Sequence, residues 1–285
     1  MGIRKTLALY AAVLAAMFHA GCTVLEDRSS CPNWLVLDMQ DVDSEIKEWQ
    51  IWLFSSGGEF LYKDTIYRRS YSSPVTLEVP RRKSVCCYMW GNVRGASRLN
   101  EKYSTASTVE KLKGVSSDSL YFFSDTLSTD REDSYIKVCP VKEFATVDIY
   151  LKGWTGNDFI ADVELECASS GFYVNREFVQ KESVIYPQMG DLGNYYTHFS
   201  CRMLRQQDNE NIVLRLKLRD VENDGSAGSI ILEKEIPLGE YLQSNGYNMQ
   251  ALNMQDVQME VDYSYNRLLI RADEWEAEYK IVEEI

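Results

Sequence analysis

The sequence predicts an all-β protein made of two β-sandwiches in series. Short apolar segments rich in β-branched and aromatic residues recur along the chain, and polar turns separate them. Only two stretches suggest helices, residues 106–114 and 238–245, and both are short. The long amphipathic helices that join parallel strands are missing, which argues against a parallel α/β fold.

The amino-terminal segment has the layout of a secretory signal peptide. Arg4 and Lys5 give it a cationic start, and residues 7–18 form an uncharged apolar run that is too short to span a bilayer as a helix. We therefore expect residues 1–21 to be removed and leave them out of the fold.

Cys22 stands where this apolar segment meets an acidic, polar one. Ala20 and Gly21 precede it, as in the lipobox of bacterial lipoproteins, although His19 occupies a place where that motif usually has an aliphatic residue. The resemblance implies that Cys22 becomes the acylated first residue and tethers the protein to outer-membrane lipid. The alternative is an ordinary secretory peptide with a chance cysteine.

Length and charge limit what the remaining chain can be. Without the first 21 residues, 264 of the 285 remain, a comfortable size for two domains. We expect domains at residues 22–142 and 143–285, because one strand pattern ends near Pro140 and a new one begins with Phe144. The formal charge of the whole chain is −13, and the excess acid excludes a nucleic-acid partner.

In the first half, the clearest strand pattern covers residues 48–54. Trp49 and Trp52 are three positions apart and must therefore point to opposite faces of that strand. Gly57 and Gly58 follow, and they predict a hairpin because both can take positive φ. The other strands expected in this half are residues 33–39, 74–80, 84–92 and 135–141.

The second half shows the same pattern of short apolar segments separated by polar turns. An acidic stretch, residues 220–225, invites a calcium interpretation but lacks the spacing of an EF-hand loop, so we expect a plain hairpin turn. The expected strands are residues 144–153, 159–168, 195–204, 211–220, 229–238, 257–264 and 267–275.

The residues give no indication of catalysis, of a metal site or of a cofactor. His198 lies inside a strand pattern without identifiable catalytic partners, and the acidic group Asp130, Glu132 and Asp133 is expected by chance in so acidic a chain. We predict that the protein is not an enzyme. The pairing of the six remaining cysteines stays open, and buried free thiols are at least as reasonable as disulfides: Cys31, Cys86, Cys87, Cys139, Cys167 and Cys201.

Six tryptophans and eighteen tyrosines could form a sugar-binding platform. Most of the tryptophans lie inside strand patterns, so core packing is the simpler explanation. A surface glycan-binding lipoprotein nevertheless remains the alternative function, and a secreted hydrolase is the weakest candidate.

Three elements resemble the anchor-subunit family of the type V fimbriae of Bacteroidetes. The first is an acidic-Arg-x-x-Cys-Pro element just after the lipid cysteine, the second a glycine-centred hairpin after a phenylalanine-tipped strand, and the third an aromatic strand ending in "WGN". In this sequence they are Asp27, Arg28, Cys31 and Pro32; Phe54, Gly57 and Gly58; and Trp90, Gly91 and Asn92.

The resemblance implies two transthyretin-like Greek-key sandwiches, a lipid tether, and a role at the base of the fimbrial shaft. Pilins of this type lose an amino-terminal strand, and a strand of the next subunit fills the groove. An anchor that keeps its first strand would end such a chain. Base anchor, accessory subunit and tip subunit are not distinguished, and the acidic Glu26 and Asp27 favour surface exposure.

The carboxy-terminal tail is the candidate contact for shaft subunits by β-strand addition. Leu268, Ile270 and Ala272 alternate with more polar positions, as on a strand that buries one further face. The alternative, rated equal, is that this segment is the last strand of the second sandwich.

Overall fold

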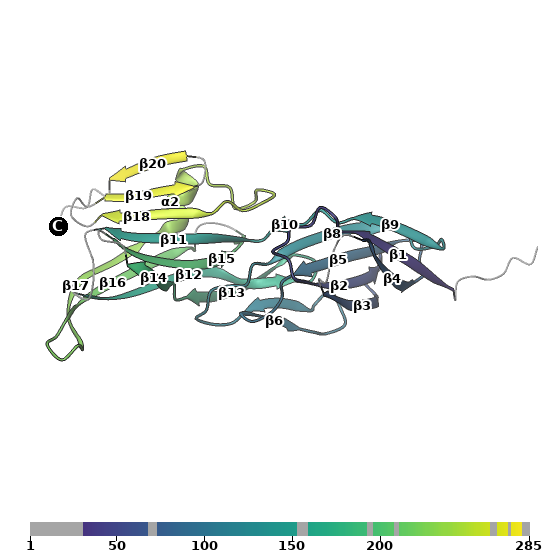
Figure 1. Cartoon of the computed structure of the whole chain (residues 1–285), viewed down its shortest axis with the longest axis horizontal. Coiled ribbons are helices and arrows are strands. Elements are labelled where there is room, and N and C mark those ends of the chain that lie inside the picture. Colours follow the sequence, from purple (N-terminus) through teal and green to yellow (C-terminus); the bar gives the residue numbers. More distant parts are fainter. Residues whose placement is uncertain are drawn as a thin grey trace, which may run out of the picture.

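The computed structural model is elongated, with sheets stacked as two sandwiches end to end (Figure 1). The structure describes residues 31–67, 73–152, 159–192, 196–207, 211–262, 267–272 and 275–280. The all-β prediction is confirmed. Across the described ranges, no helix is long and apolar enough to cross a bilayer.

The first sandwich consists of a small sheet and a larger one. In the small sheet, β1 (Pro32–Asp38) lies in the middle, antiparallel to β4 (Val75–Pro80) and parallel to β9 (Asp133–Lys137). The larger sheet has the order β10-β8-β5-β2-β3, with β10 (Val141–Lys142), β8 (Tyr121–Leu127), β5 (Val85–Gly91), β2 (Glu48–Ser55) and β3 (Phe60–Tyr67).

Strand β2 is buried on both of its faces. Trp49, Ile51 and Leu53 point into the apolar cluster between the two sheets of the first sandwich. Trp52 and Phe54 point the other way, into a second cluster. A strand apolar on successive positions is typical of an element covered on both sides, as "WQIWLF" is here.

The second sandwich also has two sheets. One has the order β14-β15-β11-β18-β19-β20, with β14 (Gln188–Leu192), β15 (Tyr196–Leu204), β11 (Phe144–Lys152), β18 (Val257–Asp262), β19 (Arg267–Ala272) and β20 (Trp275–Lys280). The other has the order β17-β16-β12-β7-β6, with β17 (Ala227–Ile236), β16 (Val213–Val221), β12 (Phe159–Tyr173), β7 (Thr108–Lys111) and β6 (Ser97–Asn100); β13 (Phe178–Ile185) pairs with β12 beside this path.

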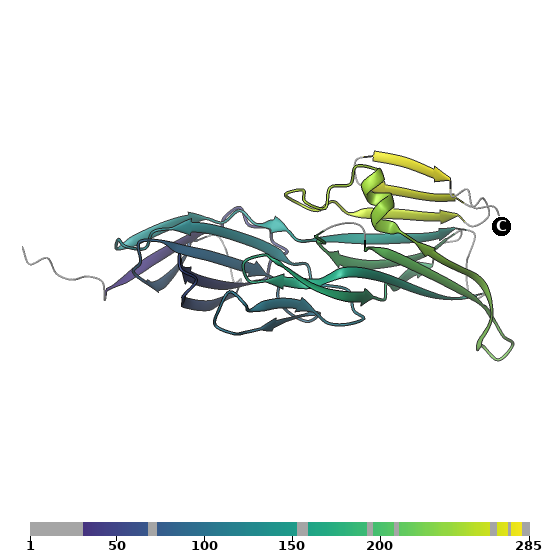
Figure 2. The same cartoon turned by 180° about the vertical axis from the view of Figure 1, so that it is seen from behind.

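Helix α2 (Leu238–Ser244) follows β17 and covers part of the second sandwich (Figure 2). Leu238 and Leu242 on its inner side join the apolar core between the two sheets. This short helix is the one that the sequence predicts at residues 238–245.

The other predicted helix, residues 106–114, is wrong. The segment contains β7, which pairs with β6 on one side and with β12 on the other. Thr108 and Val109 are β-branched and fit a pleated sheet, and pairing with distant strands overrides the weak helical pattern. The β6–β7 hairpin thus carries residues of the first half into a sheet of the second sandwich.

Both expected glycine turns are confirmed. Gly58 has φ +81° in the β2–β3 hairpin, and Gly225 has φ +81° in the turn between β16 and β17. In the second turn, the backbone N–H of Glu222 donates to the carbonyl of Ser226. The stretch 220–225 therefore ends β16 and forms the hairpin turn that the sequence favours over a calcium loop.

Candidate functional site

Of the residues predicted to carry function, Cys22 lies outside the described part of the chain. The same holds for Glu26, Asp27 and Arg28. Cys31 and Pro32 are described, and Pro32 opens strand β1. The lipid tether therefore stays a prediction.

Leu268, Ile270 and Ala272 lie on β19, for which the structure describes the backbone. In register, Leu268 pairs with Val261 of β18 and with Tyr279 of β20. Strand β19 is therefore an inner strand, and an added partner strand at this end of the sheet would meet β20.

His198 lies on the outer face of the second sandwich, across from Tyr150. Its Nε2 is 2.8 Å from Oδ1 of Asp148, and its ring stacks on Tyr150 with centroids 4.6 Å apart. A hydrolytic site would also need a nucleophile bonded to the histidine. The described residues show no hydroxyl or thiol hydrogen-bonded to this ring, and they contain no group of three or more metal-ligating side chains.

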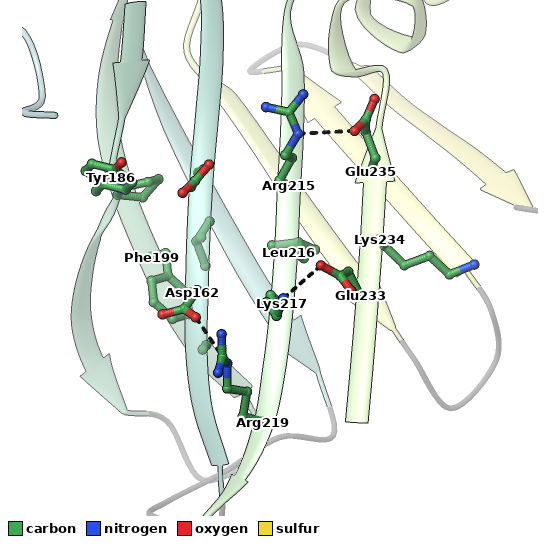
Figure 3. A pocket seen from close by; sticks show the side chains of 14 residues that line it. Asp162, Tyr186, Phe199, Arg215, Leu216, Lys217, Arg219, Glu233, Lys234 and Glu235 are labelled. Atoms are coloured by element: carbon green, nitrogen blue, oxygen red, sulfur yellow. Dashed lines mark hydrogen bonds and ion pairs between the residues drawn. The ribbon is translucent and has the colours of Figure 1, made fainter. Parts of the chain in front are cut away.

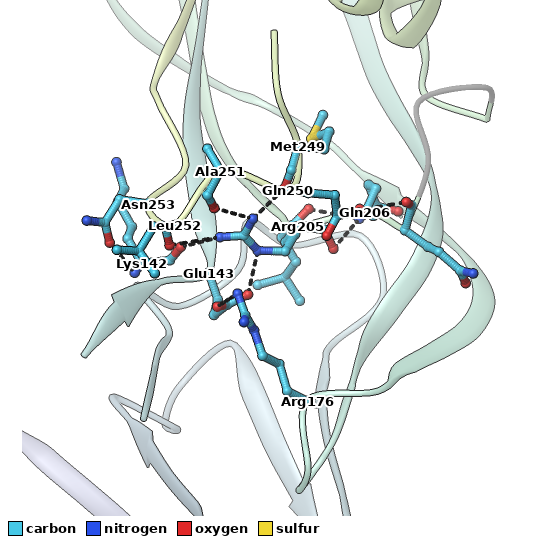
Figure 4. A network of polar contacts seen from close by, with 12 residues as sticks. Lys142, Glu143, Arg176, Arg205, Gln206, Met249, Gln250, Ala251, Leu252 and Asn253 are labelled. Carbon is cyan, nitrogen blue, oxygen red and sulfur yellow. Dashed lines mark hydrogen bonds and ion pairs between the residues drawn. The ribbon is translucent and has the colours of Figure 1, made fainter. Parts of the chain in front are cut away.

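The most unusual polar cluster is a buried ion pair where the two sandwiches meet (Figure 4). Glu143 is 0% exposed and Arg205 is 1% exposed. Nε of Arg205 donates to Oε2 of Glu143 at 2.7 Å, and Nη2 of Arg176 lies 2.7 Å from the other carboxylate oxygen. A buried carboxylate with two guanidinium partners is compensated, whereas one left alone would be costly.

The remaining donors of Arg205 bind backbone carbonyls from two segments. Nη2 donates to the carbonyl of Lys142 at 3.0 Å, just before β11, and Nη1 donates to that of Ala251 at 2.7 Å. Nη1 also donates to the carbonyl of Met249. Arg205 thereby fixes the link between the sandwiches to the loop before β18.

Burial raises the pKa of Glu143, and the positive charges of Arg205 and Arg176 oppose that rise. Sequence reasoning missed this pair, although a signal for it exists. The register of β11 with β15 joins Phe144 to Leu204, so Glu143 and Arg205 are the next positions of the same ladder. A correct pairing of these two strands would have placed the charges opposite each other.

The "WGN" element lies at the same junction. Trp90 is fully buried, stacks on Phe172 with centroids 5.0 Å apart, and donates from Nε1 to the carbonyl of Val174 at 3.0 Å. Gly91 allows a close approach, because a Cβ there would lie 2.9 Å from Cγ2 of Ile46. The motif therefore packs the first sandwich against β12 of the second.

Asn92 completes the element with a positive φ of 60°. Its Oδ1 accepts from the backbone N–H of Lys47 at 2.8 Å, and its Nδ2 donates to the carbonyls of Glu45 and Ser119. Asparagine tolerates this backbone conformation and supplies both a donor and an acceptor, which explains the residue type.

The aromatic residues are mostly core. Trp49, Trp52 and Trp90 are 0% exposed, so core packing is confirmed for them. Trp34 on β1 is 49% exposed. Among the four tryptophans whose side chains the structure describes, only Trp34 is exposed.

A hollow of about 810 Å³ lies over β12, β16 and β17 (Figure 3). Its surface carries charge in alternating rows, with bases on β16 between acids on the neighbouring strands. Nζ of Lys217 lies 2.9 Å from Glu233, and Nε of Arg215 lies 3.1 Å from Glu235. Such exposed pairs give a polar sheet surface, and no nucleophile or acid–base pair marks it as a catalytic cleft.

No protein-family model and no curated protein sequence matches this chain. The fold is similar to that of the fimbrial anchor protein Mfa2 from Porphyromonas gingivalis, with a TM-score of 0.61 and 11% identity over 87% of this chain and 100% of that one. At this identity the likeness concerns the fold alone. For the fold, this likeness confirms the resemblance to the anchor-subunit family.

Two further solved structures share the fold. A candidate polysaccharide-binding protein from Bacteroides thetaiotaomicron has a TM-score of 0.65 and 13% identity, covering 89% of this chain and 100% of that one. A candidate adhesin from Bacteroides ovatus has a TM-score of 0.62 and 13% identity, covering 89% of this chain and 97% of that one.

Proposed function

We propose that this chain is a non-enzymatic fimbrial subunit that anchors a pilus shaft to the outer membrane through acylated Cys22. It limits the length of the shaft by ending strand-exchange polymerisation. The observation that carries the proposal is the likeness of fold to a fimbrial anchor along 87% of the chain, which includes both sandwiches.

The position of β1 supports a chain-ending role. This strand is paired on both sides, with β4 and with β9, so the first sandwich is completed by the chain's own first strand. A subunit that keeps this strand offers no empty groove for a donor strand there. Polymerisation would therefore stop at such a subunit.

The junction between the sandwiches supports a role in transmitting tension from the shaft to the membrane. Pro32 opens β1 only ten residues after Cys22, so the tether would join the first sheet through a short link. From there the shared cluster around Trp90 joins the two sandwiches, and Arg205, which is paired with Glu143, donates to the carbonyl of Lys142 at the end of β10 of the first sandwich. Tension from the shaft would therefore be transmitted through these packed contacts between the sandwiches.

The test is the fate of fimbriae in the native host with Cys22→Ala, seen by electron microscopy of cells and culture supernatant. We expect long fibres to be shed into the medium. Cys31→Ala is the matched control, because Cys31 is exposed and lies outside the lipobox. Cell-bound fibres of normal length, with the variant protein itself released, would reject the anchor and favour the glycan-binding lipoprotein.

A further inference from the structure

Strand β17 is the edge strand of one sheet of the second sandwich, the sheet with the order β17-β16-β12-β7-β6. Its inner side pairs with β16 along most of its ten residues. Within the described residues, no strand pairs with its other side. The backbone groups on that side form a row that another extended chain can use.

Two large apolar side chains mark this edge. Ile230 is 50% exposed and Ile231 is 38% exposed. The register shifts here, since Leu218 pairs with Leu232 while Arg219 pairs with Ile230, so Ile231 is the extra residue of a bulge. Natural sheets usually protect a free edge with charges or bulges. Strand β17 has charges at residues 233–235 and a bulge at Ile231, but the two exposed isoleucines leave an apolar part of the edge.

The place of this edge in the molecule fits a contact with a further subunit. The β16–β17 hairpin projects at the end of the molecule that is far from β1, as both views show (Figures 1 and 2). If Cys22 holds the other end to the membrane, this edge faces away from the bilayer.

We propose that the free edge of β17 binds an extended, basic strand of a neighbouring fimbrial subunit by β-strand addition; this rests on the proposed function. Glu233 and Glu235 lie on the outward row of β17 and pair with Lys217 and Arg215 of β16, yet their side chains remain 63% and 64% exposed on this edge strand. An added strand would place its own side chains beside them, so lysine or arginine there is favoured. Ile230 and Ile231 supply the apolar part of the contact.

The charge of the chain disfavours the other simple occupant, a second copy of this protein. Two copies carry −13 each, and pairing of β17 with itself around Lys234 would bring Glu233 beside Glu235 of the other copy. A basic strand of a different subunit avoids this repulsion.

The test uses the full lipoprotein extracted from the native host in detergent and fimbriae purified from the same cells. Binding is measured by biolayer interferometry for the wild type and for the double variant Ile230→Lys/Ile231→Lys. We expect at least tenfold weaker binding, because the change removes apolar contact and adds positive charge beside a basic strand. Leu252→Lys is the control, since Leu252 is 70% exposed away from this edge and its substitution leaves binding unchanged.

A carbodiimide, which joins carboxylates to nearby amines, identifies the occupant. We expect mass spectrometry to find Glu233 or Glu235 linked to lysines in one extended segment of a shaft subunit. Two results would overturn this inference and leave the anchor proposal standing. One is cross-links to a second copy of this chain in place of a shaft subunit. The other is equal binding of the wild type and the double variant, when the double variant has an unchanged urea midpoint. Absence of wild-type binding to fimbriae, together with no shedding by Cys22→Ala, would reject both.

Discussion

Trp49 and Trp52 lie three residues apart on β2, and both are fully buried, in two different apolar clusters. The sheet that contains β2 therefore serves as a middle layer. One of its faces closes the core of the first sandwich, and the other packs toward β7 and β12 of the second. The two sandwiches share a core across their junction.

The first prediction compares two buried tryptophans of the shared cluster. Trp90 donates a hydrogen bond to the carbonyl of Val174, whereas no described residue accepts one from Nε1 of Trp52. We expect Trp90→Phe to lower the free energy of unfolding by about 1–3 kcal/mol more than Trp52→Phe, because it leaves a buried carbonyl unpaired. Urea unfolding of both variants measures the difference; equal losses would show that this bond is not significant.

The second prediction concerns the buried ion pair. Arg205→Met removes one partner and leaves the carboxylate of Glu143 buried, so we expect a loss of about 3–5 kcal/mol in the free energy of unfolding. Arg205→Met combined with Glu143→Leu should recover much of it. Arg215→Ala, which breaks an exposed pair, is the control and should cost about 0–1 kcal/mol. A double variant no more stable than the single one would contradict this account.

The third prediction tests the crossing of the β6–β7 hairpin into the second sandwich. A Cβ at Gly171 would lie 2.1 Å from the backbone oxygen of Val109, and a backbone atom cannot move aside cheaply. We expect Gly171→Ala to separate β7 from β12 and to speed hydrogen exchange of residues 108–111. Gly57→Ala is the control, because its nearest neighbour would be 3.7 Å away. Unchanged exchange in Gly171→Ala would mean that β7 does not dock as described.

The fourth prediction concerns the six cysteines of the described ranges, whose thiols are all free in the structure. Burial raises the pKa of Cys167 to about 12, which leaves almost no thiolate at neutral pH. In the reduced protein from residue 23 onward, Ellman's reagent should modify the exposed Cys31 and Cys139 quickly and spare the buried thiols until urea is added: Cys87, Cys167 and Cys201. Rapid reaction at those three without denaturant would argue against their burial.

The fifth prediction is a pH dependence at Tyr121. Burial and then the carboxylate of Glu45 raise the pKa of its phenol to about 12. The folded state therefore prefers the neutral phenol, and this contribution is complete below the unfolded pKa of about 10 and lost as the pH rises through 12. The absorbance at 295 nm of wild type minus Tyr121→Phe should rise near pH 12; a rise near pH 10 would show an ordinary, solvated tyrosine.

Local pattern was enough to predict most strands and two turns. The alternation of Trp49, Ile51 and Leu53 predicts β2, and Gly58 and Gly225 mark hairpins, because side-chain period and positive φ are properties of adjacent residues. Several strands with weak sequence patterns were not predicted, among them β6, β8, β13 and β20. Which of their residues are buried depends on the strands that pair with them, and these strands are distant in the sequence.

The sequence by itself determined an all-β chain of short strands without a recognised catalytic motif, and a cysteine in a lipobox-like setting. Only the tertiary structure decided that β7 is a strand, that Glu143 meets Arg205 across 62 positions of sequence, and that β17 is left at an edge. The physical reason is that sheet pairing joins residues far apart in the chain. Which strand becomes an edge, and which charge is buried, depends on the whole set of pairings and not on any local window.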